Sequence, residues 1–119
     1  MERFVKRDIV VLNFSFTDLS SFRRRPSLVV ADLQGNDIIL CQITREKRED
    51  IYSIILKNND FEKGGLKKES RIRPNKLFTG QKSKILYKIG NLKQFKIREV
   101  ENKIIDIFLN IKNLKIFWA

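Results

Sequence analysis

The order of two hydrophobic periodicities most constrains the fold of this chain. Up to about Gly90, short apolar runs rich in Val and Ile alternate with turn residues, which is typical of short β-strands. Beyond Gly90, apolar residues recur three and four positions apart, as on one face of a helix. These residues are Val100, Ile104, Ile107, Phe108 and Ile111. The change of period predicts a β-sheet followed by one C-terminal helix.

Six short strands are expected before the helix. They cover residues 9–14, 27–31, 37–44, 51–57, 70–73 and 85–89. Gly35-Asn36 predicts a hairpin between the second and third strands, whereas a loop is expected up to Arg24 and another around Gly64-Gly65. Strands this short suit a small SH3-like barrel. The predicted fold class is therefore β-rich α+β, with one domain over residues 1–119 and a C-terminal helix.

The strand predicted at residues 37–44 separates its side chains by chemistry. Because successive side chains of a strand point to opposite faces, Cys41 and Ile43 share one face, and Gln42 and Thr44 share the other. We expect the apolar pair to enter the core and Thr44 to lie on the open face near the strand end. The residues Phe95, Phe108 and Phe117 are also expected in the core.

The charge balance indicates the kind of partner. The chain has 25 Lys and Arg against 14 Asp and Glu, which gives a net charge of +11. Such an excess favours nucleic acid, anionic lipid or an acidic protein segment. A general preference for lysine codons competes with this interpretation, so the charge indicates a partner class and no mechanism.

The chain has no histidine and only one cysteine, Cys41, and these two facts exclude several kinds of chemistry. An intrachain disulfide is impossible, and a zinc site is disfavoured. The acidic residues are scattered, so no magnesium site is expected either. We therefore expect no metal and no cofactor, and any catalysis would depend on Arg, Lys, Ser, Thr, Tyr or single carboxylates. Without a signal-like segment or an apolar run of roughly 18 residues, we expect a cytoplasmic protein with no membrane partner.

Residues 8–30, DIVVLNFSFTDLSSFRRRPSLVV, resemble the opening of the MazF/PemK toxin family. That family has an Asp-Ile-Val strand, a loop containing Phe-Thr-Asp-Leu, and Arg-Pro before an apolar strand. The resemblance continues at residues 37–44, which end in Ile-Thr, and becomes scattered at 66–73 and 76–79. It covers most of the first ninety positions and, loosely, the final helix. Two departures affect the first turn and loop, where Arg7 replaces a common Gly and Ser15 replaces a Pro.

The resemblance implies the toxin of a toxin–antitoxin pair. Such a toxin is a sequence-specific, metal-independent endoribonuclease that cuts single-stranded RNA by attack of the 2′-OH, leaving a 2′,3′-cyclic phosphate. It also implies a symmetric homodimer and an antitoxin with an acidic, partly disordered tail.

The family's catalytic Arg and Thr map onto Arg25 and Thr44. A guanidinium suits the phosphate because its planar fork matches two phosphate oxygens and stays charged. We assign Arg25 as electrostatic stabiliser and candidate acid, and leave the base open between Glu69 and Asp18. The RNA-binding candidates are Phe16, Thr17, Arg23, Arg24, Gln42, Lys68, Ser70, Arg71 and Arg73. Phe16 suits either stacking on a base or burial in a dimer interface.

Two other functions compete with the nuclease. The related CcdB toxins share the barrel, poison DNA gyrase and carry a tryptophan near the C-terminus, as Trp118 does here. A non-catalytic nucleic-acid-binding module would also need basic surfaces. Without the family context, an Arg before a Pro is usually a solvated surface residue, and a Thr at a strand end is usually a good β-former. The pairing of Arg25 with Thr44 favours the nuclease, because a gyrase poison has no use for it.

Overall fold

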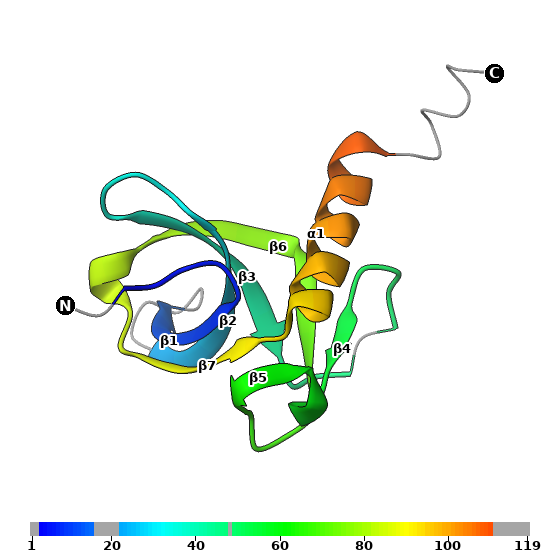
Figure 1. The fold of residues 1–119 in the computed structure, drawn as a ribbon, viewed down its shortest axis with the longest axis horizontal. Coiled ribbons are helices and arrows are strands. Elements are labelled where there is room, and N and C mark those ends of the chain that lie inside the picture. The colour runs from blue at the N-terminus through cyan, green and yellow to red at the C-terminus, as the bar shows by residue number, and fades with distance from the viewer. Residues whose placement is uncertain (1–2, 16–21, 48, 111–119) are drawn as a thin grey trace.

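The computed structural model describes residues 3–15, 22–47 and 49–110. In this part of the chain, seven strands form one antiparallel sheet in the order β4-β6-β3-β2-β1-β7-β5. The strands are β1 (Asp8–Ser15), β2 (Phe22–Asp32), β3 (Asp37–Thr44), β4 (Ile54–Leu56), β5 (Phe61–Gly64), β6 (Ser70–Gln81) and β7 (Tyr87–Leu92). Two 3₁₀ turns, η1 (Asn58–Asp60) and η2 (Lys82–Lys84), and one helix, α1 (Gln94–Leu109), complete the order. The sheet curls into a half-barrel, and α1 packs at one side of it (Figure 1), so the predicted fold class is confirmed.

Strand alternation divides the buried side chains between two clusters on opposite faces of the sheet. One cluster includes the buried face of α1, and we call its side of the sheet the helix-side face. Its members include Ile9, Leu28, Cys41, Ile43, Ile72, Leu92, Ile97 and Val100. The other cluster lies on what we call the far face. Its members are Val10, Leu12, Val29, Ile38 and Leu40, with Phe4, Phe14, Phe78 and Ile85 packed against them.

The strand expected at residues 37–44 and its hairpin are confirmed. β3 spans these residues, Cys41 and Ile43 are buried, and Gln42 and Thr44 are only partly buried. Gly35 has a φ of 75° in the connection from β2, a conformation that glycine adopts without strain. Arg7 has a φ of 86°, so the turn keeps a glycine-like backbone although the residue is an arginine.

Several predicted boundaries were wrong because backbone pairing extends beyond the hydrophobic pattern. Of the loop expected before Arg24, the described residues 13–15 and 22–24 are strand, since β1 and β2 pair out to Ser15 and Phe22, and residues 16–21 lie outside the described residues. β6 continues to Gln81 through Pro74, which lies in the irregularity between the Cys41–Leu77 and Gln42–Arg73 pairs. A strand irregularity tolerates proline because no ladder N–H is needed there. β5 was missed, and the strands expected at 51–57 and 85–89 are β4 and β7, with different bounds.

The helix packs on the sheet through the first part of the predicted face, since Val100 is buried and Ile104 packs against the same cluster. Phe95 is 59% exposed and Phe108 is 71% exposed, so their expected burial was wrong. The buried residues of α1 are Lys96, Ile97 and Val100, all in its first half. Ile111 and Phe117 lie outside the described residues. None of the helices in the described part of the chain is long and apolar enough to cross a membrane.

Candidate nucleic-acid interface

Six polar side chains gather on the far face where β2, β3 and β6 lie side by side. Gln42 pairs with Ser27 on one side and with Arg73 on the other, and Thr44 pairs with Arg71. The β2–β3 pairing ends at Ser27–Gln42, and Arg25 and Thr44 each lie two residues beyond this last pair on their own strand. Arg25 and Ser27 pair on their other side with Leu12 and Val10 of the far-face cluster, which fixes their face. We call this set the polar block: Arg25, Ser27, Gln42, Thr44, Arg71 and Arg73.

Two buried donors in the polar block lack hydrogen-bond partners among the described residues. They are Ser27 Oγ and Arg73 Nε, which belong to the residues on either side of Gln42 in the sheet. Buried polar atoms are almost always bonded, so two orphans beside one residue are unusual. With Gln42 between them, they form a polar row across β2, β3 and β6 on the far face.

Two further residues of the polar block, Arg71 and Thr44, have local partners, and Asp50 lies near Arg73. Arg71 Nη1 lies 3.4 Å from Glu69 Oε1, and its side chain is only 12% exposed. Thr44 Oγ1 accepts a hydrogen bond from the backbone N–H of Glu46 at 3.2 Å, which shapes the turn after β3. The Asp50 carboxylate accepts hydrogen bonds from the N–H groups of Ser53 and Tyr52, which hold its pKa below the usual value, with a smaller contribution from the charge of Arg73.

A pocket of about 280 Å³ opens at the same ends of β2 and β3 and is completed by residues 66–70. Six of its ten lining residues are basic: Arg23, Arg24, Arg25, Arg45, Lys67 and Lys68. Its apolar lining consists of Pro26, Ile43 and Leu66. Ser70 is buried and donates a hydrogen bond to the carbonyl of Lys68 at 3.1 Å, which holds the loop against the sheet. We call this feature the basic pocket.

The predicted site residues fall into these two features. Arg23, Arg24, Lys68 and Ser70 line the basic pocket, Gln42, Thr44, Arg71 and Arg73 belong to the polar block, and Arg25 belongs to both. Strand alternation puts Pro26 and Ile43 on the helix-side face, so the basic pocket and the polar block meet at Arg25. Glu69 lies on the loop of residues 66–70, between Lys68 of the basic pocket and Arg71 of the polar block in the sequence. Phe16, Thr17 and Asp18 lie outside the described residues.

The sequence alone did not single out Arg45 or Leu66, which also line the basic pocket, whereas Lys67 beside Lys68 belongs to a basic pair that suits contact with the RNA backbone. Arg45 directly follows Thr44, and alternation would have placed it on the pocket side of the strand end. Leu66 and Lys67 begin the segment of scattered resemblance at 66–73.

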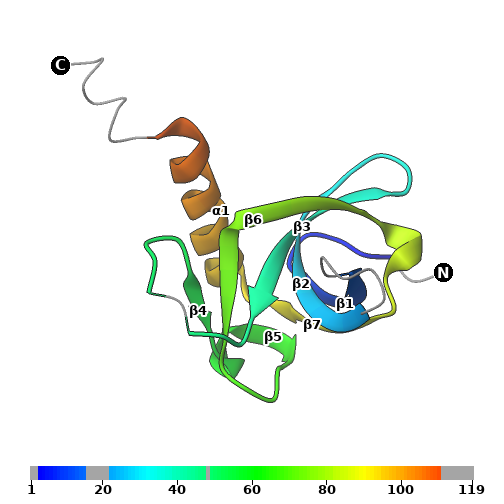
Figure 2. The ribbon, with the colours of Figure 1, turned by 180° about the vertical axis from the view of Figure 1, so that it is seen from behind.

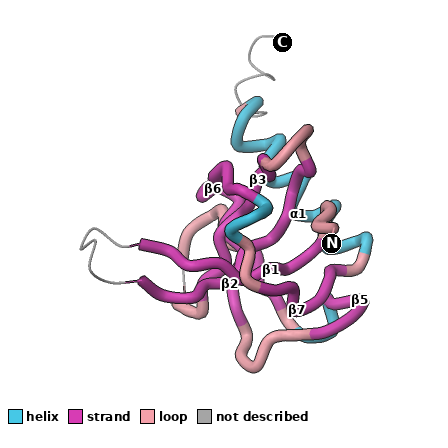
Figure 3. Tube along the Cα trace, turned by 90° about the vertical axis from the view of Figure 1, so that its left-hand side faces the viewer, coloured by secondary structure: helices cyan, strands magenta, loops and turns pink. Residues whose placement is uncertain are grey.

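Figure 3 shows the paired ends of β1 and β2 projecting from the body of the barrel. β2 carries three consecutive arginines in this part of its length.

The single cysteine, Cys41, is buried, and its thiol is poorly suited to catalysis or metal binding. Burial raises the pKa of the Cys41 thiol to about 12, and the thiol donates a hydrogen bond to the carbonyl of Arg73 at 2.9 Å. A protonated, enclosed thiol is a poor nucleophile and a poor metal ligand. Among the described residues there is no group of three or more His, Cys, Asp or Glu that could hold a metal ion.

The curled antiparallel sheet, the helix packed on it and the arginine-rich pocket define a small barrel protein with a strongly basic site. The chain matches the model of the family described as PemK-like, MazF-like toxin of type II toxin–antitoxin system over residues 6–108, and it belongs to that family. The resemblance seen in the sequence is thereby confirmed.

Two solved structures share the fold. One is an endoribonuclease in complex with its cognate antitoxin from a mycobacterial species, with a TM-score of 0.68 at 10% identity, covering 86% of this chain and 91% of that one. The other is an endoribonuclease from a mycobacterial species, with a TM-score of 0.59 at 16% identity, covering 87% of this chain and 86% of that one. No curated protein matches the chain in sequence.

Proposed function

We propose that this protein is the endoribonuclease toxin of its toxin–antitoxin pair and cuts single-stranded RNA at specific sequences without a metal. The observation that carries the proposal is the position of Arg25, where the basic pocket meets the polar block. A phosphate beside Arg25 is within a strongly basic surface and next to hydroxyl and guanidinium donors. Family membership and the endoribonucleases that share the fold support the same activity.

The reaction requires no nucleophile from the protein. The 2′-OH of the RNA attacks the adjacent phosphorus, a bond forms from the 2′-oxygen, and the bond to the 5′-oxygen of the next nucleotide breaks. The 2′-OH gives its proton to a base and the leaving 5′-oxygen takes up a proton, so the products carry a 2′,3′-cyclic phosphate and a free 5′-OH. Arg25 stabilises the charge that builds on the non-bridging oxygens, and the Thr44 hydroxyl donates a second hydrogen bond.

The cleavage step also needs a base for the proton of the 2′-OH and an acid for the leaving 5′-oxygen. A guanidinium stays protonated near neutral pH and is a poor base, so we assign Arg25 as electrostatic stabiliser and candidate acid and not as the base. Glu69 is one candidate base, and its contact with Arg71 keeps it beside the polar block. Asp18 is the other.

The protein works in the cytoplasm as a symmetric homodimer and is neutralised by an antitoxin. An acidic antitoxin segment would compete with RNA for the basic pocket. Sedimentation measures the dimer, and inhibition of cleavage by the cognate antitoxin measures the second partner. A monomer that is fully active would contradict the dimer.

The test is to incubate purified protein with a long single-stranded RNA in EDTA and map the cut ends. We expect discrete cuts with 2′,3′-cyclic phosphate ends, and a loss of about 10²–10³ in rate for Arg25→Ala. Arg98→Ala, a matched change on the exposed face of α1, should cut as the wild type does. Intact RNA with a folded protein would overturn the nuclease, and gyrase inhibition and plain nucleic-acid binding would then be measured.

A further inference from the structure

The basic pocket combines two surfaces that a simple phosphate site does not need together. Its rim is cationic, and Arg24, Arg45, Lys67 and Lys68 on it are exposed to solvent. Its floor is apolar, with Ile43 buried and Pro26 and Leu66 partly buried. A phosphate is bound by charge alone, whereas an unpaired base requires a non-polar surface against its flat face.

The size of the pocket limits what the floor can hold. Pockets for drug-sized ligands have volumes of roughly 300–1,000 Å³. At about 280 Å³, the basic pocket has room for a single heterocyclic ring system and not for several nucleotides. The exposed cations around it can reach the phosphates on either side of the bound base.

The polar side chains around the floor are almost all donors. Arg and Lys donate hydrogen bonds and accept none, and the hydroxyl of Ser70, the remaining polar lining residue, already donates to a carbonyl. Guanine offers the acceptors O6 and N7, and uracil offers O4 and O2. Adenine and cytosine carry an amino group in place of guanine O6 and uracil O4, so at that position a donor would face a donor.

We propose that the basic pocket holds one unpaired base of the RNA beside the scissile phosphate and selects a keto base, guanine or uracil, at that position. The assignment rests on the proposed nuclease function and deepens it. Arg25 belongs both to the pocket and to the polar block, so a base in the pocket belongs to a nucleotide next to the phosphate that Arg25 stabilises.

The experiment is cleavage of an RNA library with randomised sequence, followed by sequencing of the cut ends. The wild type should show one position near the cut dominated by guanine or uracil. Leu66→Trp fills the floor, and the double variant Arg45→Met, Lys67→Met removes two donors while keeping the side-chain length. Each should reduce the preference at that single position by about tenfold and leave the other positions unchanged.

Lys84→Met is the matched control, because Lys84 lies on η2 outside the basic pocket and is exposed. Circular dichroism checks that each variant is folded, and the double variant keeps the test valid if Leu66→Trp does not fold. Cleavage with unchanged preference in a folded pocket variant would overturn the base assignment alone. Unchanged preference with weakened antitoxin inhibition would overturn it in favour of an antitoxin site. No cleavage of any RNA by the wild type would overturn the proposed function, and with it the base assignment.

Discussion

Ser27 lies in the middle of β2 with its side chain fully buried and its hydroxyl without a partner in the described structure. Leaving a buried hydroxyl unpaired costs about 1–3 kcal/mol. We therefore expect Ser27→Ala to raise the free energy of unfolding by about 1 kcal/mol, as measured by urea denaturation. A loss of stability would instead indicate that the hydroxyl is bonded in solution, for which the side chain of Gln42 is the nearest cross-strand candidate.

Because of Cys41, we expect the free energy of unfolding to fall at alkaline pH. Its thiol has a pKa of about 12 in the folded state against an ordinary 9.0, because burial disfavours the thiolate. The folded state therefore holds the proton more tightly than the unfolded state, and its contribution to stability is complete below pH 9.0 and is lost as the pH rises toward 12.

Urea denaturation at pH 8 and at pH 10.5 measures this dependence. Wild-type protein should lose more stability between the two pH values than Cys41→Val, which has no thiol to ionise. Comparing the pH-dependent loss within each protein removes the packing difference between the two side chains. Equal losses would mean that the thiol ionises as readily in the folded state as in the unfolded chain.

At the scale of the elements, the sequence pattern predicts β3 well and the hairpin arms poorly. β3 alternates between two buried clusters, so hydrophobicity marks both its bounds and its faces. The outer arm of β2 carries Arg23 and Arg24, whose side chains are exposed. Their pairing with β1 is made by backbone groups, so no hydrophobic residue in this arm marks it as a strand.

The same reasoning explains which parts of the site could be predicted. The polar block follows from strand alternation and from the register that β3 imposes on its neighbours. The basic pocket joins Arg24, Arg45 and Lys67, which belong to separate segments. Their proximity depends on how tightly the sheet curls, and no local pattern carries that information.

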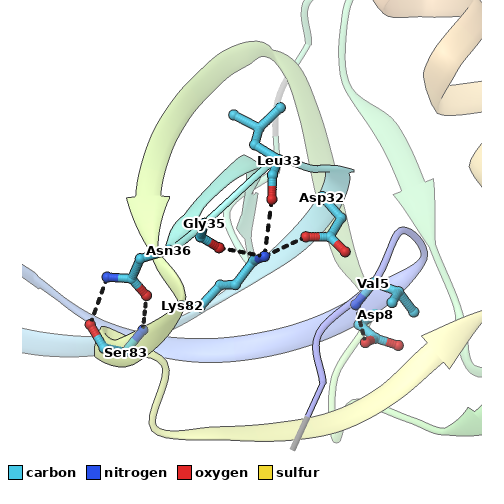
Figure 4. A network of polar contacts seen from close by, with 8 residues as sticks. All are labelled: Val5, Asp8, Asp32, Leu33, Gly35, Asn36, Lys82 and Ser83. Atoms are coloured by element: carbon cyan, nitrogen blue, oxygen red, sulfur yellow. Dashed lines mark hydrogen bonds and ion pairs between the residues drawn. The ribbon is translucent and has the colours of Figure 1, made fainter.

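The turn between β2 and β3 is anchored by one lysine at the end of the sheet away from the basic pocket (Figure 4). Lys82 Nζ lies 2.6 Å from Asp32 Oδ1 and donates hydrogen bonds to the carbonyls of Leu33 and Gly35 at 3.1 and 2.9 Å. Asn36 adds two hydrogen bonds to Ser83. The network ties η2 to the hairpin connection.

Lys82→Met keeps the stem of the side chain and removes the charge that three oxygens share. Because the side chain is only 26% exposed, we expect a loss of stability on the order of 1 kcal/mol, measured by urea denaturation. RNA cleavage should be unchanged, since about 20 Å of β2 separates Asp32 from Pro26 at the basic pocket. Lys84→Met on the same 3₁₀ turn is the control and should leave stability unchanged. A drop in cleavage by folded Lys82→Met would mean that the two ends of the sheet communicate.

At the scale of the whole molecule, the network of Lys82 and the basic pocket lie at opposite ends of the same strands. The network of Lys82 holds one end of β2 and β3 in fixed geometry. The other end spreads apart (Figure 2), where β3 continues to pair with β6 beyond its last pair with β2. If β2 and β3 stayed paired at this end, their backbone hydrogen bonds would leave no gap between the strands. Because they separate, there is room between them for the basic pocket and for the cations around it.

The net charge of +11 and the cationic rim predict that RNA affinity depends steeply on salt. Each phosphate neutralised on a single strand adds about 0.7 to the slope of log affinity against log salt, so about four contacts give a slope near −2.8. Affinity for a non-cleavable 2′-O-methyl RNA should then fall about fifty-fold between 50 and 200 mM salt, as measured by fluorescence anisotropy. Arg24→Gln should flatten the slope by about 0.7, whereas Lys84→Gln, at the anchored end, should leave it unchanged. An affinity that is insensitive to salt would mean that the positive charge of this chain does not bind the RNA backbone. If Lys84→Gln changed the slope as much as Arg24→Gln does, the RNA would not follow the basic pocket.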